Sequence, residues 1–284
     1  MTRAWVFNLD ADEELAAWPR SYQPSATLRE RTVHFSTALR ALLSEGDVVV
    51  EQAHDLSEHL GASWCPTPRA VDRWRRANVR LPNVPTPACL KRVNHRSFGY
   101  ALGRFLPLAE WITTEREFDD ICRSSKALLA KRPFGFAGRG QRRLCGHEIT
   151  EGDRRWVRAT LNKYGGFALE LRVDLVRELA LHGFINETGE VVLGEITESK
   201  TSQGAWVRSE RAHDVEISHR AQFVDVISGT AFALFREGYF GPFGVDAYIW
   251  RDSFGEHFNP RSEVNARYTM GWTVGMGGLP IRQP

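Results

Sequence analysis

A lysine at the end of an apolar segment, followed directly by glycines, constrains the fold of this chain more than any other feature. The run Ala127–Arg132 is apolar up to Lys131 and is typical of a buried strand, and a glycine-rich loop, Pro133–Gly140, follows it. A cation at the end of a buried strand is costly unless an anion compensates its charge. Glycines beside it let backbone N–H groups approach phosphate oxygens closely. The segment therefore predicts a sheet edge that carries an anion site, although a β-turn with a surface lysine gives the same local pattern.

Composition excludes several classes of protein. Apolar residues make up 42% of the 284 residues and charged residues 25%, as in ordinary globular domains. The longest apolar stretches, such as Val245–Trp250, are too short to cross a bilayer, and Met1–Asp10 lacks the features of a signal peptide. A net charge of +2 gives no electrostatic reason to expect nucleic acid. We therefore expect a cytoplasmic protein of two or three subdomains that binds neither nucleic acid nor a membrane.

The order of the segments predicts an α+β chain that begins with a small α/β unit. A strand at Ala4–Leu9, a helix at Thr27–Leu43 and a strand at Asp47–Glu51 give a β-α-β start. Further helices are expected at Arg69–Ala77, from Pro87 toward Gly103, from Thr114 to Ser124, at Glu151–Lys163 and at Ala221–Arg236. Further strands are expected at Glu110–Ile112, around Leu144, and at Phe167–Val173, Leu179–Asn186, Val191–Ile196, Phe243–Trp250 and His257–Arg267. The polar stretch Glu198–Glu216 is predicted to be a mobile loop.

Two late strands carry groups that suit a divalent cation. Asp246 lies within an apolar strand, where an unpaired carboxylate is costly unless it faces solvent or binds a metal. In a strand, alternate residues share a face, so Glu263, Asn265 and Arg267 are expected to project together. Carboxylate and amide oxygens are ligands that Mg²⁺ prefers, and a guanidinium could hold a phosphate oxygen. An edge strand with a polar face is the alternative interpretation.

A third segment could line a purine pocket. Phe167–Val173 is extended and apolar with one carboxylate, Glu170, and its backbone at Leu171 and Val173 could bind the edge of an adenine. Glu178 could accept a hydrogen bond from a ribose hydroxyl. An ordinary amphipathic strand explains the same residues.

Taken in this order, these features resemble the ATP-grasp superfamily. That family has a strand ending in lysine, a glycine-rich phosphate loop, an adenine hinge with a glutamate, an acidic residue on a strand, and a final Glu-x-Asn-x-Arg strand. The resemblance covers about Lys91 to Met276. It implies the ATP-grasp fold, with two α+β subdomains that clasp ATP, preceded by a small α/β domain. We expect the N-terminal domain at 1–90 and the ATP-grasp domain at 91–284, divided into a small subdomain (about 104–170) and a large subdomain (about 171–284).

The resemblance also implies an activity and a set of site residues. ATP and Mg²⁺, or Mn²⁺, would activate a small carboxylate as an acyl-phosphate, which an amine or another nucleophile then attacks. Nucleotide contacts are expected from Lys131, Gly135, Gly138, Arg139, Gly140, Glu170, Leu171, Val173, Glu178 and Arg96. Metal ligands are expected at Asp246, Glu263 and Asn265, and catalytic cations at Arg267 and Lys131.

The sequence departs from the family at one place. An earlier family lysine has no clear counterpart, and Arg96, His95 or Lys91 could replace it. The departure leaves two other interpretations open, namely a regulatory or degenerate nucleotide-binding protein without ligase activity and a small-molecule kinase on the same scaffold. The sequence identifies neither the acid nor the nucleophile, and it leaves open whether the chain forms a homodimer.

Overall fold

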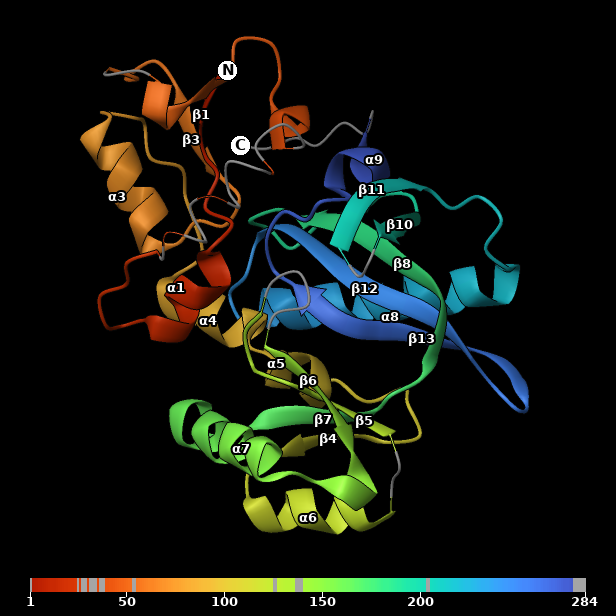
Figure 1. Cartoon of the computed structure of the whole chain (residues 1–284). Coiled ribbons are helices and arrows are strands. Elements are labelled where there is room, and N and C mark those ends of the chain that lie inside the picture. Colours follow the sequence, from red (N-terminus) through yellow and green to blue (C-terminus); the bar gives the residue numbers. More distant parts are fainter. Residues whose placement is uncertain are drawn as a thin grey trace.

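The computed structural model describes residues 2–24, 39–52, 55–124, 127–135, 140–202 and 205–277, with the single residues 26, 30 and 35. They form an α+β structure with three sheets, and each sheet takes its strands from one stretch of the chain (Figure 1). Most of the predicted helix Thr27–Leu43 and the predicted site residues Gly138 and Arg139 lie outside the described residues. Among the described helices, none combines the length and apolarity needed to cross a membrane.

The N-terminal unit is a parallel three-stranded sheet in the order β2-β1-β3. Its elements are β1 (Arg3–Val6), α1 (Ala11–Ala17), the 3₁₀ turn η1 (Arg40–Leu42), β2 (Val48–Val49), the 3₁₀ turn η2 (Val50–Gln52), β3 (Leu60–Ser63) and α3 (Pro68–Arg76). The predicted first two strands and the helix at Arg69–Ala77 are confirmed, whereas β3 and α1 are not among the predicted elements. Trp74 of α3 is buried against this sheet together with Ala4 and Val6. Parallel strands bring their carboxyl ends to one edge, and α1 begins there, directly after β1.

The small antiparallel sheet has the order β4-β7-β5-β6. It consists of β4 (Ala109–Ile112), β5 (Ala127–Lys131), β6 (Gln141–Cys145) and β7 (Phe167–Leu171), with η3 (Gly146–Glu148) after β6. Two helices, α6 (Glu115–Ser124) and α7 (Glu151–Tyr164), cover its outer face (Figure 1). Leu128, Ala130 and Leu169 form the core beneath these helices. The opposite face therefore remains for the rest of the molecule, and it carries the alternate residues Lys131 and Glu170.

The large sheet has the order β11-β10-β8-β12-β13, with β9 paired to β8. Its strands are β8 (Asp174–Ile185), β9 (Val191–Leu193), β10 (Thr197–Ser202), β11 (Ala205–Arg211), β12 (Gly241–Asp252) and β13 (Gly255–Asn265). The long helix α8 (Ile217–Arg236) buries Phe223 and Ile227 in the same core as Leu181 and Val245 of this sheet. A short helix, α9 (Trp272–Met276), packs near one end of the sheet. The other face is left free to carry polar groups.

The predicted helix from Pro87 toward Gly103 is two helices, α4 (Pro87–Asn94) and α5 (Arg96–Ala101). Pro87 occupies the first turn of α4, as expected from its fixed φ. The break lies at His95, which is extended and whose ring accepts a hydrogen bond from the Ser97 backbone N–H at 3.3 Å. This residue ends one helix and caps the next, and the break sets the position of Arg96 at the start of α5.

The prediction of a mobile loop over Glu198–Glu216 is wrong. Most of this stretch is the antiparallel pair β10 and β11, with Glu198 opposite Glu210. Lys200 bridges these two carboxylates at 2.7 and 3.1 Å, which removes their repulsion. Polar side chains that alternate on a solvent-facing strand have the same composition as a loop, so composition alone gave the wrong result.

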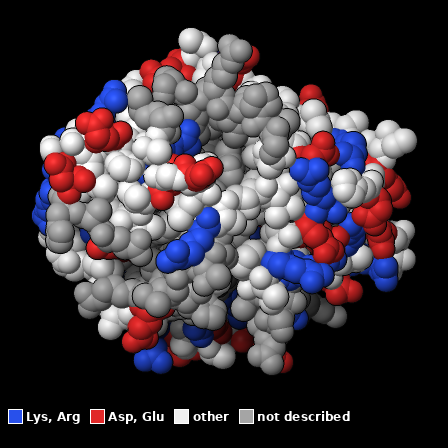
Figure 2. Space-filling model, turned by 90° about the horizontal axis from the view of Figure 1, so that it is seen from above, with Lys and Arg blue, Asp and Glu red and all other residues white. Residues whose placement is uncertain are grey.

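Charges of both signs are interspersed on the face seen in Figure 2, where Lys and Arg lie next to Asp and Glu. This view shows no extended field of one sign.

Candidate functional site

Asp246 and Glu263 lie directly opposite each other on neighbouring strands. The register of β12 and β13 pairs these two residues, so both carboxylates leave the same face of the large sheet. Ala180 of β8 is opposite Asp246 on the other side, and Glu178 is opposite Tyr248, so Glu178 shares this face. The two carboxylates that are expected to bind one metal ion therefore lie side by side on one face of the sheet.

Asn265 completes a set of oxygen donors. Its Nδ2 donates to Asp246 Oδ2 at 3.0 Å, which leaves Oδ1 as the amide atom available to a cation. Across the part of the chain that the structure describes, no group of three or more His, Cys, Asp and Glu side chains is placed to hold a metal ion. The chain thus offers two carboxylates and one amide oxygen. That set suits Mg²⁺, which binds one or two carboxylates and takes its other ligands from phosphates and water.

The two carboxylates differ in protonation. Burial, and then the charge of Glu263, raises the pKa of Asp246 to about 7. Burial also raises the pKa of Glu263, but the nearby cations, Arg96 first and then Lys131 and Arg267, together hold that pKa below its usual value. Arg96 lies 3.0 Å from Glu263, and its side chain is 5% exposed. Near neutral pH the pair therefore holds a proton that a divalent cation would displace.

Lys131 ends β5 with its ammonium on the face directed at the large sheet. Its Nζ pairs with Glu170 Oε2 at 2.5 Å, and both side chains are buried. The other oxygen of Glu170 accepts a hydrogen bond from the Tyr100 hydroxyl. Burial, followed by the nearby Glu170 charge, raises the Tyr100 pKa, so this hydroxyl stays a donor. The Glu170 side chain is thus fully engaged, and its backbone lies in the inner strand β7, which pairs with β4 and β5.

The resemblance leaves three candidates, Arg96, His95 and Lys91, for a lysine that has no clear counterpart in this sequence. Of these, Arg96 lies in the candidate site. Its Nη2 contacts Glu263, and its Nε donates to the Arg132 carbonyl at 3.1 Å, beside the glycine-rich loop. Lys91 points away, since its ammonium donates to the Trp18 carbonyl and lies 5.9 Å from the Trp18 ring. Burial lowers the pKa of His95 to about 4, so its imidazole is neutral at pH 7.

Arg267 lies just past the end of β13 and is held by a residue of the N-terminal unit. β13 ends at Asn265, so the period of two no longer fixes the direction of the Arg267 side chain. Its guanidinium binds Asp12 of α1, with Nη2 2.9 Å from Oδ2, and both side chains are buried. The charge of Arg267 still lowers the pKa of Asp246 and of Glu263. Asp12 is a partner of a candidate site residue that sequence reasoning missed, although three acidic residues in the first turn of a helix after a strand were a visible signal.

The predicted purine segment lies where the two sheets meet. Leu171 ends β7, and Val173 packs against Leu106, Tyr248 and Trp250. Burial raises the pKa of Glu178, which is half-buried on β8. These residues therefore border the same inter-sheet space as the charged groups.

The ends of the glycine-rich loop are described, whereas residues 136–139 are not. Gly140 has a φ of +76°, and its carbonyl accepts from the Arg132 N–H at 2.9 Å. A Cβ at position 140 would lie 3.2 Å from the Arg132 Cβ, so both the conformation and the space favour glycine. This bond closes the loop next to Lys131.

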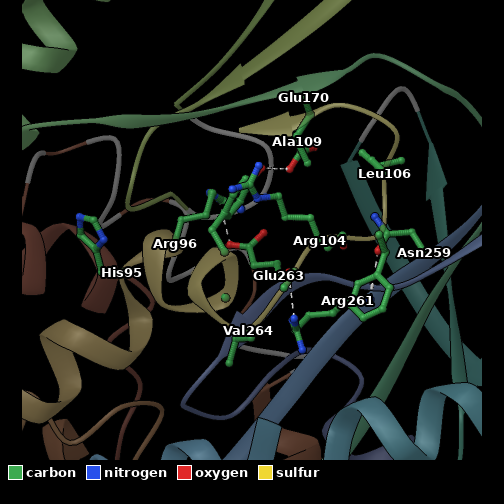
Figure 3. A pocket seen from close by; sticks show the side chains of 15 residues that line it. His95, Arg96, Arg104, Leu106, Ala109, Glu170, Asn259, Arg261, Glu263 and Val264 are labelled. Atoms are coloured by element: carbon green, nitrogen blue, oxygen red, sulfur yellow. Dashed lines mark hydrogen bonds and ion pairs between the residues drawn. The ribbon is translucent and has the colours of Figure 1, made fainter. Parts of the chain in front are cut away.

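A pocket with about 450 Å³ of empty space, part of it open to solvent, lies beside this site. It is bordered by α5, the connection from α5 to β4, and β13, and Arg96, Glu170 and Glu263 form one side of it (Figure 3). Arg261 and Asn259 of β13 form another side. Sequence reasoning did not single out Arg261, because an arginine in a polar strand carries no distinct signal.

Comparisons with known proteins identify the fold. No protein-family model and no curated protein matches the sequence. Among solved structures, the chain resembles a D-alanyl-alanine synthetase from Vibrio cholerae, with a TM-score of 0.54 and 10% identity over 94% of this chain and 89% of that one. It also resembles a biotin carboxylase from Campylobacter jejuni in a β,γ-ATP complex, with a TM-score of 0.57 and 13% identity over 96% and 61% of the two chains.

A third similar structure is an N5-carboxyaminoimidazole ribonucleotide synthetase in an ADP complex, with a TM-score of 0.51 and 15% identity. The match covers 81% of this chain and 61% of that one, so the chain spans less than two thirds of this relative and of the carboxylase. The three are ATP-grasp enzymes, and the predicted fold is confirmed.

Proposed function

We propose that this chain, which has the ATP-grasp fold, is an ATP- and Mg²⁺-dependent ligase that forms ADP. It would activate a small-molecule carboxylate as an acyl-phosphate for attack by an amine or another nucleophile. The proposal places an N-terminal domain at 1–90 and the ATP-grasp domain at 91–284, with subdomains at about 104–170 and 171–284.

One observation carries this proposal: Asp246 and Glu263 are opposed across β12 and β13, with Asn265 in reach. Two half-buried carboxylates this close repel each other, and a bound cation would remove that repulsion. The donor set fits Mg²⁺, and phosphate oxygens of ATP would supply further ligands. Bound Mg²⁺ would neutralise charge on the β- and γ-phosphates during phosphoryl transfer.

The residues of the chain have distinct tasks in this proposal. Lys131 approaches the space from the small sheet and Arg96 approaches it from α5, and both would neutralise phosphate charge after release from Glu170 and Glu263. Backbone N–H groups of the loop with Gly135, Gly138, Arg139 and Gly140 would bind phosphate oxygens. Arg267, oriented by Asp12, would stabilise charge on the transferring phosphoryl group.

The hinge completes the nucleotide site. The backbone at Leu171 and Val173 would bind the adenine edge, and Tyr248 and Trp250 supply apolar surface beside it. Glu178 would accept a hydrogen bond from a ribose hydroxyl. The similar structures in ADP and ATP complexes support a nucleotide in this space, and the names of two of them describe synthetases.

A second candidate is a nucleotide-binding protein without ligase activity. Arg96, a candidate phosphate contact, is already paired with Glu263, a candidate metal ligand. If that pair persisted with nucleotide bound, the metal site would not form. Binding of ATP without any metal-dependent turnover would favour this candidate.

The test is release of ADP in the presence of ATP and Mg²⁺, screened over small carboxylic acids with and without amines. A ligase releases ADP only when the acid is present, and the product contains the new bond. A stable phosphorylated product without that bond indicates a kinase. ATP binding by thermal shift, with no acid-dependent ADP across the screen, would contradict the ligase proposal.

The matched variants are Glu263→Gln and Glu256→Gln. Both remove one carboxylate from β13, but Glu256 is exposed and pairs with Arg251, away from the site. Activity should be lost in the first variant and kept in the second.

A further inference from the structure

The long helix α8 covers one face of the large sheet, and its outer side faces solvent. The helix buries Phe223 and Ile227 in the core that also contains Val245 (Figure 1). Neighbouring residues of a strand point to opposite faces, so Val245 points away from the face that carries Asp246. α8 thus lies on the reverse of the sheet from the candidate site, and a partner on its outer side would not cover that site.

The outer side of α8 carries a stripe of apolar and small residues, which we call the α8 stripe. Its five exposed members recur at intervals of three or four residues, and they are Ile217, Ala221, Val224, Ser228 and Phe232. This spacing puts them on one side of a helix. In the described parts of the chain, eight large apolar side chains are exposed, and three of them belong to this stripe. Such concentrated apolar surface is typical of an interaction site.

The two ends of the α8 stripe carry opposite charges. Glu216 directly precedes the helix, its side chain is 74% exposed, and its carboxylate lies 3.9 Å from His219 Nδ1, beyond hydrogen-bond distance. Arg236 is the exposed last residue of the helix, and its guanidinium carbon lies 6.0 Å from the centre of the Phe232 ring. Among the described residues, no carboxylate pairs with Arg236. The five residues of the stripe between these ends carry no charge.

This arrangement is complementary to itself when two copies of α8 run antiparallel. Glu216 and Arg236 lie ten residues on either side of Val226, which is about 15 Å along a helix in each direction. A two-fold axis at Val226 therefore places Glu216 of each copy beside Arg236 of the other. The helix dipoles also run in opposite directions. A parallel pair would instead bring like charges together at both ends.

One residue opposes the antiparallel pair. Asp225 is exposed beside the stripe and is one residue from the two-fold axis, so its two copies approach each other. This single like-charge contact is set against two contacts of opposite charge, and all three are surface interactions of similar size. The apolar stripe therefore supplies most of the free energy of association, and the charges at its ends set the direction.

We propose that two copies of this chain associate through their α8 stripes, with the helices antiparallel about a two-fold axis near Val226. A contact of this symmetry closes on itself, so association stops at the dimer. A pair of helices covers less than the about 800 Å² per partner of a standard interface, so the expected dissociation constant is micromolar. The proposal does not rest on the proposed function.

The experiment is analytical ultracentrifugation of the full chain from micromolar to submillimolar concentration. The wild type should pass from monomer to dimer as its concentration rises, with no larger species. A monomer at every concentration, or assembly beyond the dimer, would overturn the proposal.

The variant Phe232→Glu tests whether the stripe is the interface. It places a carboxylate where the dimer excludes water, so the dissociation constant should rise about tenfold or more. Phe254→Glu is the matched control, because Phe254 is 91% exposed in the turn between β12 and β13 and is not on α8. Equal dissociation constants in the two variants would overturn the proposal.

Charge reversal tests the direction of the helices. Glu216→Arg and Arg236→Glu should each weaken self-association about fivefold, because both end contacts become repulsive. A mixture of these two variants recreates both pairs of opposite charge, so dimers should form in it at least as tightly as in the wild type. Asp225→Asn should tighten the dimer about twofold, since it removes the like-charge contact. No recovery in the mixture would overturn the antiparallel arrangement.

Discussion

The two sheets that face each other bring opposite charge balances to one space. On the small sheet, Lys131 and Glu170 form a buried pair, and the Tyr100 hydroxyl satisfies the remaining oxygen. On the large sheet, Asp246 and Glu263 are neighbours, and Arg96 directly pairs with only one of them. The small-sheet half is balanced without a ligand, whereas the large-sheet half retains a carboxylate whose ionisation opposes folding.

This difference indicates where the binding of a ligand can stabilise the folded chain. A cation bound by the large-sheet half would remove the repulsion between its carboxylates, while the small-sheet half must give up an existing ion pair to bind phosphate. Functional sites often hold such locally unfavourable charge, at a cost in stability that the rest of the fold offsets. The predictions below change one half at a time.

The largest effect is expected from Glu263→Gln. The substitution keeps the shape but removes a negative charge from the proposed Mg²⁺ site. Acid-dependent ADP release should fall about 100-fold or more, since metal stabilisation of phosphoryl transfer is worth several kcal/mol. The measurement is the steady-state rate at saturating Mg²⁺ and ATP. A rate within about threefold of the Glu256→Gln control would contradict the metal assignment.

The next effect concerns Lys131. Lys131→Ala alone leaves the buried Glu170 carboxylate unpaired, which should destabilise the fold by about 3 kcal/mol or more. The informative comparison is therefore between the double variant Lys131→Met/Glu170→Gln and the single variant Glu170→Gln. Gln at position 170 can still accept a hydrogen bond from the Tyr100 hydroxyl. ATP affinity measured by calorimetry should be about tenfold weaker in the double variant, owing to the lost charge-assisted contact. Equal ATP affinity in the two would remove Lys131 from the nucleotide site.

A smaller effect is expected from Asp246→Asn in the absence of divalent cations. The pKa of Asp246 is raised to about 7 in the folded chain, so the unfolded chain releases this proton at lower pH. The stabilisation from the protonated carboxyl is present below about pH 4 and is lost as the pH rises to about 7. Asn has no such loss, so the stability of the variant relative to the wild type should rise steadily between pH 4 and 8. Urea unfolding with EDTA across this range measures it, and a constant difference would contradict the raised pKa.

Much of the candidate metal site was predictable because strands have a period of two. That period places Glu263 and Asn265 on one face, and apolar Val264 between them fixes which face is buried. The same reasoning puts the side chain of Asp246 on one face of its strand and those of its buried neighbours Val245 and Ala247 on the other face. The pairing of Asp246 with Glu263 then follows only from the register, which a sequence does not specify by itself.

Other features depend on contacts that are distant along the chain. Asp12 and Arg267 are 255 positions apart, and Tyr100 and Glu170 are 70 apart, so no local pattern connects them. The strands β10 and β11 were missed because their polar, solvent-facing residues resemble a loop. Arg261 was missed because an arginine in a polar strand carries no distinct signal in the sequence.

The most direct test of the account is the coupling between Mg²⁺ and ATP binding in the wild type and in Glu263→Gln. Calorimetric titration with ATP, with EDTA or with saturating Mg²⁺, gives two dissociation constants for each protein. We predict that Mg²⁺ tightens ATP binding about tenfold or more in the wild type. In Glu263→Gln this enhancement should disappear, while affinity for metal-free ATP is kept or improved, because one carboxylate no longer repels the phosphates. The same enhancement in both proteins would contradict the claim that Asp246, Glu263 and Asn265 hold the metal of a bound nucleotide.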